Sequence, residues 1–288
     1  MGIELSITGE TKLTGLVGGS TITGSFSPMI HTASFKEIGI NAVYISFPIN
    51  FEDLESAVKG LEAIAVGYNV TMPYKTHICQ FLDDLSPAAE LMGAVNTVEI
   101  RDGKSLGHNT DGAGFVENLR LLGVNPKEKI VTVIGAGGAG SVIFTQLALD
   151  EVSEIHIFNM RDGFWDATEK RISSLAAKTG VAINLHDLDD RDMLKESISQ
   201  SNILVNATHI GAGKYEDQSI VDEKMLHDGL VVADTVYKPL ETKLIKMAKA
   251  KGLLTAPGAG MLLQQAALAE RIWFGVDMPL EKIRKEFF

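Results

Sequence analysis

The sequence contains very little cysteine and no long apolar segment. Cys79 is the only cysteine among 288 residues, which excludes an internal disulfide and fits a reducing compartment. No apolar run approaches the roughly 20 residues that a membrane-spanning helix needs. The first residues, MGIELSITGETK, lack the basic segment and apolar core of a signal peptide. We therefore expect a cytoplasmic protein with no membrane partner.

Positive charge is also scarce, with 26 Lys and Arg against 37 Asp and Glu and a formal net charge of -11. This balance argues against binding to nucleic acid or to an anionic membrane surface. The seven histidines form no H-E-x-x-H or comparable ligand spacing, and no G-x-S-x-G motif occurs. We therefore expect no metal site, and neither a metal hydrolase nor a serine hydrolase.

What the sequence does contain is an alternation of short β-branched apolar runs with longer amphipathic stretches, which is typical of α/β proteins. We predict two domains. Residues 1–110 form an α/β domain that includes a hairpin, AVNTVEIRDGKSLGHN, turning at Asp102-Gly103. Residues 111–257 alternate regularly, which predicts a doubly wound parallel sheet covered on both faces. Residues 258–288 are helical without a further strand, so we expect them to complete the first domain.

A glycine-rich loop lies between a predicted strand and a predicted helix. The segment VTVIGAGGAG places Gly135, Gly137 and Gly140 in G-x-G-x-x-G register. Gly135 permits the tight turn, Gly137 lets the backbone approach a pyrophosphate, and Gly140 allows close packing of helix and strand. The helix N-terminus then offers N–H groups and a positive dipole to the phosphates. We therefore predict a dinucleotide site; the alternative is a glycine-rich turn that binds nothing.

Polar residues gather at two places in the first domain. In GSFSP, Ser25 and Ser27 precede a helix start on one side of an extended segment, a geometry suited to a carboxylate. The alternative is that one serine only caps the helix. In NVTMPYK, Asn69, Thr71 and Lys75 follow a strand, where open α/β sheets bind ligands.

Two further segments add Asn96 in GAVNT, and Asn109 and Asp111 in GHNTDG, although Asp111 taken alone is better explained as a helix N-cap. The motifs SFSPMIH, NVTMPYK, GAVNT, NTDG, GAGGAG, NAT and GAGMLLQQAA together resemble the shikimate dehydrogenase family in order and spacing, across almost the whole chain. The resemblance implies a substrate domain built from the N-terminal part and the C-terminal helices, and a Rossmann-type cofactor domain.

The same resemblance implies reversible NAD(P)-dependent hydride transfer to or from a hydroxylated cyclohexene or cyclohexane carboxylate, in the chorismate pathway of aromatic amino acid biosynthesis. The implied reaction interconverts shikimate and 3-dehydroshikimate; quinate and 3-dehydroquinate stay open as a second pair. Lys75 and Asp111 would be the catalytic acid–base pair. The implied substrate-binding residues are Ser25, Ser27, Thr71, Lys75, Asn96, Asp111, Tyr237 and Gln265. The implied cofactor-binding residues are Gly135, Ala136, Gly137, Gly138, Ala139, Gly140, Asn159, Arg161, Asp162, Thr208, Val236 and Gly258.

The segment HIFNMRDGF, at the tip of the next predicted strand, bears on the choice of cofactor. NADP-specific family members tend to carry Asn-Arg-Thr here, whereas this chain has Asn159, Met160, Arg161 and Asp162. The run RDGF resembles the quinate/shikimate dehydrogenase branch, which accepts NAD and whose aspartate can bind the ribose hydroxyls. The resemblance therefore implies NAD as the preferred cofactor and NADP as a weaker second one. The alternative is that Asp162 caps the following helix.

Two other functions compete with this interpretation. Another Rossmann dehydrogenase would not explain Ser25, Ser27, Asn96 and NTDG occurring together. A catalytically silent paralogue that only binds dinucleotide would have no chemical need for both Lys75 and Asp111. Ser27 favours shikimate, since quinate-biased family members tend to have Thr at this position. The sequence leaves the oligomeric state open, a homodimer included.

Overall fold

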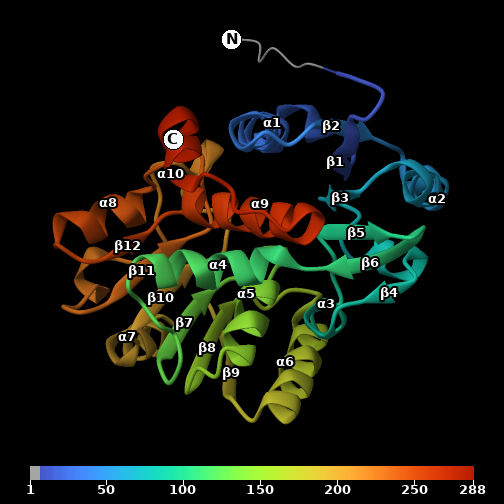
Figure 1. The fold of residues 1–288 in the computed structure, drawn as a ribbon. Coiled ribbons are helices and arrows are strands. Elements are labelled where there is room, and N and C mark those ends of the chain that lie inside the picture. Colours follow the sequence, from blue (N-terminus) through green and yellow to red (C-terminus); the bar gives the residue numbers. More distant parts are fainter. Residues whose placement is uncertain (1–6) are drawn as a thin grey trace. The chain divides into compact units, whose positions relative to one another are not determined.

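The computed structural model describes residues 7–288, which divide into two compact α/β units (Figure 1). The first unit contains the chain up to Thr110 together with Gln265–Phe288, and the second is Asp111–Gln264. The first six residues of the N-terminal segment considered for a signal peptide lie outside the described residues. Within residues 7–288, no helix is both long and apolar enough to cross a membrane.

The first unit is built on a mixed six-stranded sheet in the order β2-β1-β3-β5-β6-β4. β1 pairs in parallel with β2 and β3, and β4 in parallel with β6, whereas β5 is antiparallel to both β3 and β6. Its strands are β1 (Lys12–Gly18), β2 (Ala42–Pro48), β3 (Gly67–Val70), β4 (Asp84–Leu85), β5 (Thr97–Arg101) and β6 (Lys104–His108). Its helices are η1 (Ser20–Gly24), α1 (Ser27–Ile38), η2 (Phe51–Asp53), α2 (Leu54–Ile64), η3 (His77–Phe81), α3 (Pro87–Met92) and α10 (Leu280–Phe287), with the C-terminal part of α9 (Gly258–Phe274).

Local sequence signals explain several boundaries in this unit. Pro28 lies in the first turn of α1, where a backbone N–H would have no hydrogen-bond partner within the helix, so proline is tolerated there. Gly39 ends the helix with a left-handed φ of 72°. The predicted hairpin is confirmed: Arg101 pairs with Lys104 across a two-residue turn. Asp102 and Gly103 take φ values of 51° and 71°, as such turns require.

The second unit has an all-parallel six-stranded sheet in the order β12-β11-β10-β7-β8-β9. Numbered within the unit, this is the 3-2-1-4-5-6 order of dinucleotide-binding folds, so the predicted doubly wound sheet is confirmed. Its strands are β7 (Ile130–Ile134), β8 (Glu154–Asn159), β9 (Ala182–Asp187), β10 (Ile203–Asn206), β11 (Val231–Asp234) and β12 (Thr255–Ala256). Its helices are α4 (Thr110–Leu121), α5 (Gly138–Leu149), α6 (Trp165–Thr179), α7 (Arg191–Gln200), η4 (Gly213–Tyr215), η5 (Glu223–Met225), α8 (Lys243–Ala250) and the start of α9.

Successive residues of a strand point to opposite faces of the sheet, and apolar side chains cover both faces of each sheet. In the second unit, one face packs α7 and α8 through a cluster that includes Leu194 and Ile245, and strand residues of the opposite face, such as Val133, are equally buried. In the first unit, α2 covers one face. On the other face α1 and α9 pack together, with Trp273 of α9 in the same cluster as Tyr44 of β2. The predicted return of the C-terminal helices to the first unit is therefore confirmed, although it begins at Gln265 and residues 258–264 group with the second unit.

Candidate active site

Two predicted serines of the first unit adjoin each other at the start of α1. Ser25 follows η1, Phe26 has a helical conformation with φ -75° and ψ -18°, and Ser27 is the first residue of α1. The segment is thus a tight turn, and the predicted extended conformation is wrong. Ser25 Oγ accepts a hydrogen bond from the Ser27 N–H and donates one to Ser27 Oγ, both at 3.2 Å. Ser25 therefore satisfies one helix N–H while the two hydroxyls remain together.

A series of polar contacts runs from these serines into the sheet of the first unit. Burial raises the pKa of Tyr44 well above its ordinary value, and the neighbouring Ser27 side chain lowers it in part. The Tyr44 hydroxyl donates to Oδ1 of Asn69 at 2.8 Å, and the Asn69 amide donates to Oγ1 of Thr97 at 2.9 Å and to the Asn96 carbonyl at 3.1 Å. Because a hydroxyl has one proton and Tyr44 uses its proton on Asn69, only the oxygen lone pairs of Tyr44 are left to face Ser27.

Asn96 extends this series to the start of α4. Its Oδ1 accepts the Thr110 N–H at 2.7 Å, and its Nδ2 donates to Thr110 Oγ1 at 2.9 Å. Asn109 is held by a 3.0 Å bond from its Nδ2 to the carbonyl of Ala94. Thr110 is the first residue of α4 and Asp111 the second, in the first turn. Asp111 is therefore not the N-cap residue, and the capping explanation for it is wrong.

Lys75 follows β3 in a loop whose backbone is fixed at several points. The Thr71 N–H donates to the Val17 carbonyl at 2.9 Å, the Tyr74 N–H donates to the Thr71 carbonyl at 3.0 Å, and the Val95 N–H donates to the Lys75 carbonyl at 2.8 Å. Lys75 is half-buried. Its place in the fold is thus set by β1, β3 and the segment before β5, rather than by a mobile surface loop.

The remaining substrate-binding candidates lie on other elements. Gln265, in α9, is buried with 8% of its surface exposed and belongs to the first unit. Tyr237 follows β11 in the second unit and is 40% exposed. The structure therefore gathers Ser25, Ser27 and Asn96 along one series of polar contacts, and places Asp111 and Tyr237 in the other unit.

The glycine loop of the second unit has the shape that a pyrophosphate needs. Gly135 has a φ of 100°, which other residues rarely adopt, and a Cβ on Gly140 would lie 1.9 Å from the Gly135 carbonyl oxygen. A Cβ on Gly137 would instead meet nothing within 4 Å. Asn159, at the end of β8, accepts the Ala136 N–H at 3.1 Å and so fixes the loop. The residues present therefore fit a dinucleotide at the N-terminus of α5.

The turn after β8 presents both apolar and charged side chains. Met160 and Phe164 are 64% and 75% exposed. The Arg161 guanidinium lies 4.9 Å from the ring centre of Trp165. Asp162 Oδ1 accepts the Phe164 N–H at 2.9 Å, one residue before α6 begins, and Phe164 rather than Asp162 is the N-cap residue. Asp162 thus closes the turn ahead of the helix and does not cap it.

A buried network at the ends of β10 and β11 was not indicated by the sequence motifs. Asp234 is 1% exposed; its Oδ1 accepts from Asn206 Nδ2 at 3.0 Å and from the Val236 N–H at 2.9 Å, and its Oδ2 accepts from Thr242 Oγ1 at 2.7 Å. Burial raises the pKa of Asp234 to about 6, against the opposing effect of these hydrogen bonds. Asn206 Oδ1 also accepts from Thr208 Oγ1 at 2.7 Å. The network fixes the two loops that carry Thr208 and Val236, at the edge where this fold binds ligands.

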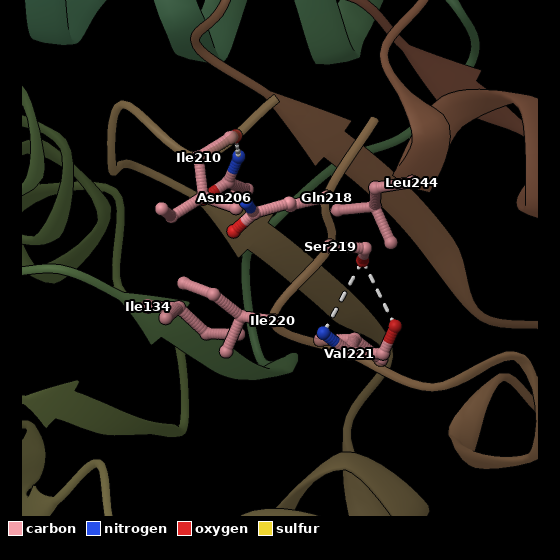
Figure 2. A pocket seen from close by; sticks show the side chains of 8 residues that line it. All are labelled: Ile134, Asn206, Ile210, Gln218, Ser219, Ile220, Val221 and Leu244. Atoms are coloured by element: carbon pink, nitrogen blue, oxygen red, sulfur yellow. Dashed lines mark hydrogen bonds between the residues drawn. The ribbon is translucent and has the colours of Figure 1, made fainter. Parts of the chain in front are cut away.

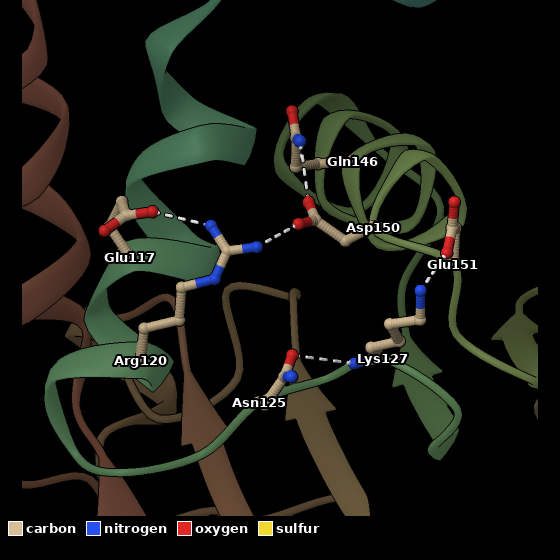
Figure 3. Close-up of polar contacts among 7 residues, drawn as sticks. All are labelled: Glu117, Arg120, Asn125, Lys127, Gln146, Asp150 and Glu151. Atoms are coloured by element: carbon tan, nitrogen blue, oxygen red, sulfur yellow. Dashed lines mark hydrogen bonds and ion pairs between the residues drawn. The ribbon is translucent and has the colours of Figure 1, made fainter.

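A small cavity and a surface groove of the second unit are lined by none of the predicted site residues. The first is a cavity of about 10 Å³ (Figure 2), which is room for a single water molecule. The second is a groove of about 480 Å³, where Arg120 of α4 pairs with Glu117 and with Asp150 at the end of α5 (Figure 3). This pairing ties α4 to α5 near their C-terminal ends. The cavity is lined by Ile134, Asn206, Ile210, Gln218, Ser219, Ile220, Val221 and Leu244, and the groove by Arg120, Asn125, Lys127, Leu149, Asp150 and Glu151.

The strand order and glycine loop of the second unit define the chain as an α/β protein of the Rossmann-type, dinucleotide-binding class. The family model described as the shikimate dehydrogenase substrate binding domain matches residues 17–98, and that of the shikimate 5'-dehydrogenase C-terminal domain matches residues 258–286. Shikimate dehydrogenase (NADP(+)) of Listeria monocytogenes is 41% identical over 284 residues, covering 98% of this chain and 97% of that protein. The chain belongs to the shikimate dehydrogenase family.

Solved structures agree with this membership. Shikimate 5-dehydrogenase from Listeria monocytogenes, in complex with shikimate and NAD, superposes with a TM-score of 0.95 at 41% identity and covers 99% of both chains. A shikimate dehydrogenase in complex with NADP+ has a TM-score of 0.89 at 36% identity, covering 99% of this chain and 97% of that one.

Proposed function

We propose that this protein is a shikimate dehydrogenase that interconverts shikimate and 3-dehydroshikimate by NAD(P)-dependent hydride transfer. The observation that carries the proposal is the series of polar contacts from Ser25 to Thr110, in a protein that belongs to the shikimate dehydrogenase family. Such a series suits a small carboxylate with several ring hydroxyls, because its hydroxyls and amides are already oriented before the substrate arrives. The protein would then act in aromatic amino acid biosynthesis, in the cytoplasm.

We assign the proton chemistry to Lys75 and Asp111. When bound, the nicotinamide accepts or supplies the hydride. The reacting hydroxyl must lose its proton as the hydride leaves, so a base must be within hydrogen-bond reach. Lys75 takes this proton in the oxidising direction and returns it in the reducing direction, while Asp111 orients the lysine and accepts from a neighbouring hydroxyl. Ser25, Ser27 and Tyr237 would bind the carboxylate, and Thr71, Asn96 and Gln265 the ring hydroxyls.

The dinucleotide would be held by residues 111–257 as the cofactor domain, with residues 1–110 and 258–288 as the substrate domain. The open side of Gly137 and the first turn of α5 suit the pyrophosphate. Thr208 and Val236 lie on the loops that the buried Asp234 fixes. Gly258 packs so closely on the backbone of residues 235 and 236 that a Cβ there would lie 2.6 Å from either carbonyl oxygen. Because Gly258 has no side chain, it leaves a backbone surface for the nicotinamide end of the cofactor.

We further propose that NAD is preferred and NADP is a weaker second cofactor. Three features support NAD: Met160 cannot pair with a phosphate, Arg161 lies against Trp165, and Asp162 would repel a 2′-phosphate. The NADP(+) relatives make NADP the alternative. Asp162→Ala should raise the ratio of kcat/KM for NADP to that for NAD, measured at saturating shikimate. A wild-type protein that prefers NADP would contradict the assignment.

One assay separates the candidate activities. Nicotinamide absorbance is followed with shikimate or quinate, each combined with NAD or NADP. We expect turnover of shikimate, and weaker turnover of quinate because Ser27 stands where quinate-biased family members tend to have Thr. No turnover in any of the four mixtures, together with measurable dinucleotide binding, would favour the silent paralogue instead.

A further inference from the structure

A charged side chain is completely buried in the first unit, behind the serine turn. Glu270 of α9 is 0% exposed, and its Oε1 lies 2.8 Å from Nδ1 of His31, which is also 0% exposed. Its Oε2 accepts a hydrogen bond from Ser34 Oγ at 2.6 Å. His31 and Ser34 both lie in α1, so this contact joins α1 to α9 through three polar side chains inside an apolar cluster.

The imidazole of His31 packs against the phenol of Tyr44, which lies between Ser27 and Asn69 in the series of polar contacts. The His31 and Tyr44 rings are stacked with centroids 4.3 Å apart and an interplanar angle of 12°. Tyr44 donates to Asn69 and lies beside Ser27, as described above. Burial, and to a smaller extent the charge of Glu270, raises the pKa of Tyr44 well above its ordinary value. Tyr44 therefore remains a neutral phenol, able to donate its proton.

Stability alone gives little reason for this pair. Burying a carboxyl group and an imidazole costs desolvation that their mutual contact commonly no more than offsets, so apolar residues of similar volume would stabilise the fold as well. What the pair does supply is orientation: a hydrogen bond at Nδ1 fixes the plane of the imidazole, whereas an apolar ring would be held by packing only. The plane of His31 in turn determines where the stacked Tyr44 ring, and hence its hydroxyl, can lie.

We propose that Glu270 and His31 are positioning residues for the carboxylate end of the substrate, acting through Tyr44 on Ser27 and Asn69. The proposal rests on the proposed function, since it assumes that the serine turn binds the substrate carboxylate. The carboxylate end is remote from the reacting hydroxyl, so a misplaced Ser27 weakens ground-state and transition-state binding alike. Loss of the pair should therefore raise KM for shikimate and leave kcat nearly unchanged.

Two substitutions at Glu270 test the proposal. Glu270→Leu keeps a similar volume and removes the tie to His31, and it should raise KM for shikimate about tenfold with kcat changed less than about twofold. Glu270→Gln keeps the shape and a hydrogen-bonding oxygen, so it should restore KM to within about twofold of wild type. Ser105→Ala is the matched control, because Ser105 is also buried and bonded to carboxylates, at Asp83 and Glu62, outside this network. It should leave KM for shikimate unchanged.

Different results would contradict the positioning role of Glu270 and the proposed function. Wild-type KM in Glu270→Leu, an equal rise in Ser105→Ala, an equal rise in KM for the dinucleotide, or no rescue by Glu270→Gln would each overturn the positioning role. A wild-type protein without shikimate turnover would overturn the proposed function instead. If Glu270→Leu does not fold, the ¹⁵N signals of the His31 ring, assigned through Glu270→Gln, are recorded in the wild-type protein with reduced cofactor. Adding shikimate should shift them, and unchanged signals would contradict the proposal.

Discussion

At the scale of single residues, the proposed chemistry depends most on Lys75. Replacing it with Ala removes the proton acceptor but not the fixed loop, since its backbone carbonyl still binds the Val95 N–H. General acid–base catalysis is typically worth about 10²–10⁴-fold, so kcat for Lys75→Ala should fall by that order. The dissociation constant for NAD, measured by calorimetry, should change little because the glycine loop lies in another segment.

The matched control for this substitution is Lys59→Ala. Lys59 is an exposed lysine of α2 in an i,i+4 pair with Glu55, so its loss should leave kcat unchanged. Wild-type turnover in Lys75→Ala would remove Lys75 from the catalytic role.

Asp234 gives a second prediction at this scale, one about pH. Its folded pKa of about 6 lies above the ordinary aspartate value of 3.8, so between these values the folded state binds more protons than the unfolded state. The stability that this group contributes is therefore fully present below about pH 4 and is lost as pH rises to about 6. Asp234→Asn, which cannot titrate, should lack this change.

The measurement is urea unfolding of both proteins from pH 4 to pH 7. The unfolding free energy of wild type minus that of Asp234→Asn should fall by up to ~3 kcal/mol over this range. Comparing the two proteins cancels the titration of the other carboxylates. A difference that does not depend on pH would show that Asp234 is not protonated preferentially in the folded state.

Individual site residues differ in how far the sequence alone could predict them. Ser25, Lys75 and Asp111 stand in short motifs, so the family pattern identifies them. Tyr44 and Asp234 stand in no such motif, because their partners are distant along the chain: Tyr44 binds Asn69, and Asp234 binds Asn206. Only the folded sheet brings these pairs together, so a buried acid within VVADT is indistinguishable by pattern from a solvated residue at a strand end.

At the scale of elements, the glycine loop allows a sharp comparison of two glycines in the same motif. Gly140→Ala would place a methyl group 1.9 Å from the Gly135 carbonyl oxygen, so the backbone must move. We expect this variant to lose about 1–3 kcal/mol of unfolding free energy, and NAD binding with it. Gly137→Ala meets no atom within 4 Å, so it should keep wild-type stability and lose affinity for NAD alone.

Urea unfolding and calorimetric titration with NAD check the two glycine variants, each serving as the control for the other. Equal NAD affinity in Gly137→Ala and wild type would argue that no pyrophosphate approaches this backbone. A stable Gly140→Ala would instead argue against the close packing of the loop on the helix.

Elements whose own residues favour a turn or a helix end could be predicted from the sequence. Short strands that form only because a neighbouring strand binds them could not. The hairpin at Asp102-Gly103 and the end of α1 at Gly39 follow from residues that tolerate positive φ. β4 and β12 have two residues each, too few for an alternating pattern, and exist because a neighbouring strand binds them. The serine turn was mispredicted as extended because Phe26, which has no turn preference of its own, takes a helical conformation there.

At the scale of the whole molecule, the first unit depends on both ends of the chain. Its cluster around Tyr44 includes Ala269 and Trp273 from α9, and the Trp273 indole donates to the Val98 carbonyl at 2.9 Å. Gly67 makes room for that indole, since a Cβ there would lie 2.3 Å from it. The sequence indicated this return through the lack of a further strand after residue 257, but gave no partner for Trp273.

This dependence predicts what a truncation would do. A chain ending at Gln264 loses Glu270 and Trp273, and losing one buried Trp typically costs about 3–5 kcal/mol against a total stability of about 5–15 kcal/mol. The first unit should therefore unfold and shikimate binding should disappear. NAD binding should persist, because the glycine loop, Asn159 and the Asp234 network all belong to the second unit. A chain ending at Pro279 keeps all of α9, so it should retain binding of both ligands. Shikimate binding by the chain ending at Gln264, measured by calorimetry, would show that the first unit folds without α9.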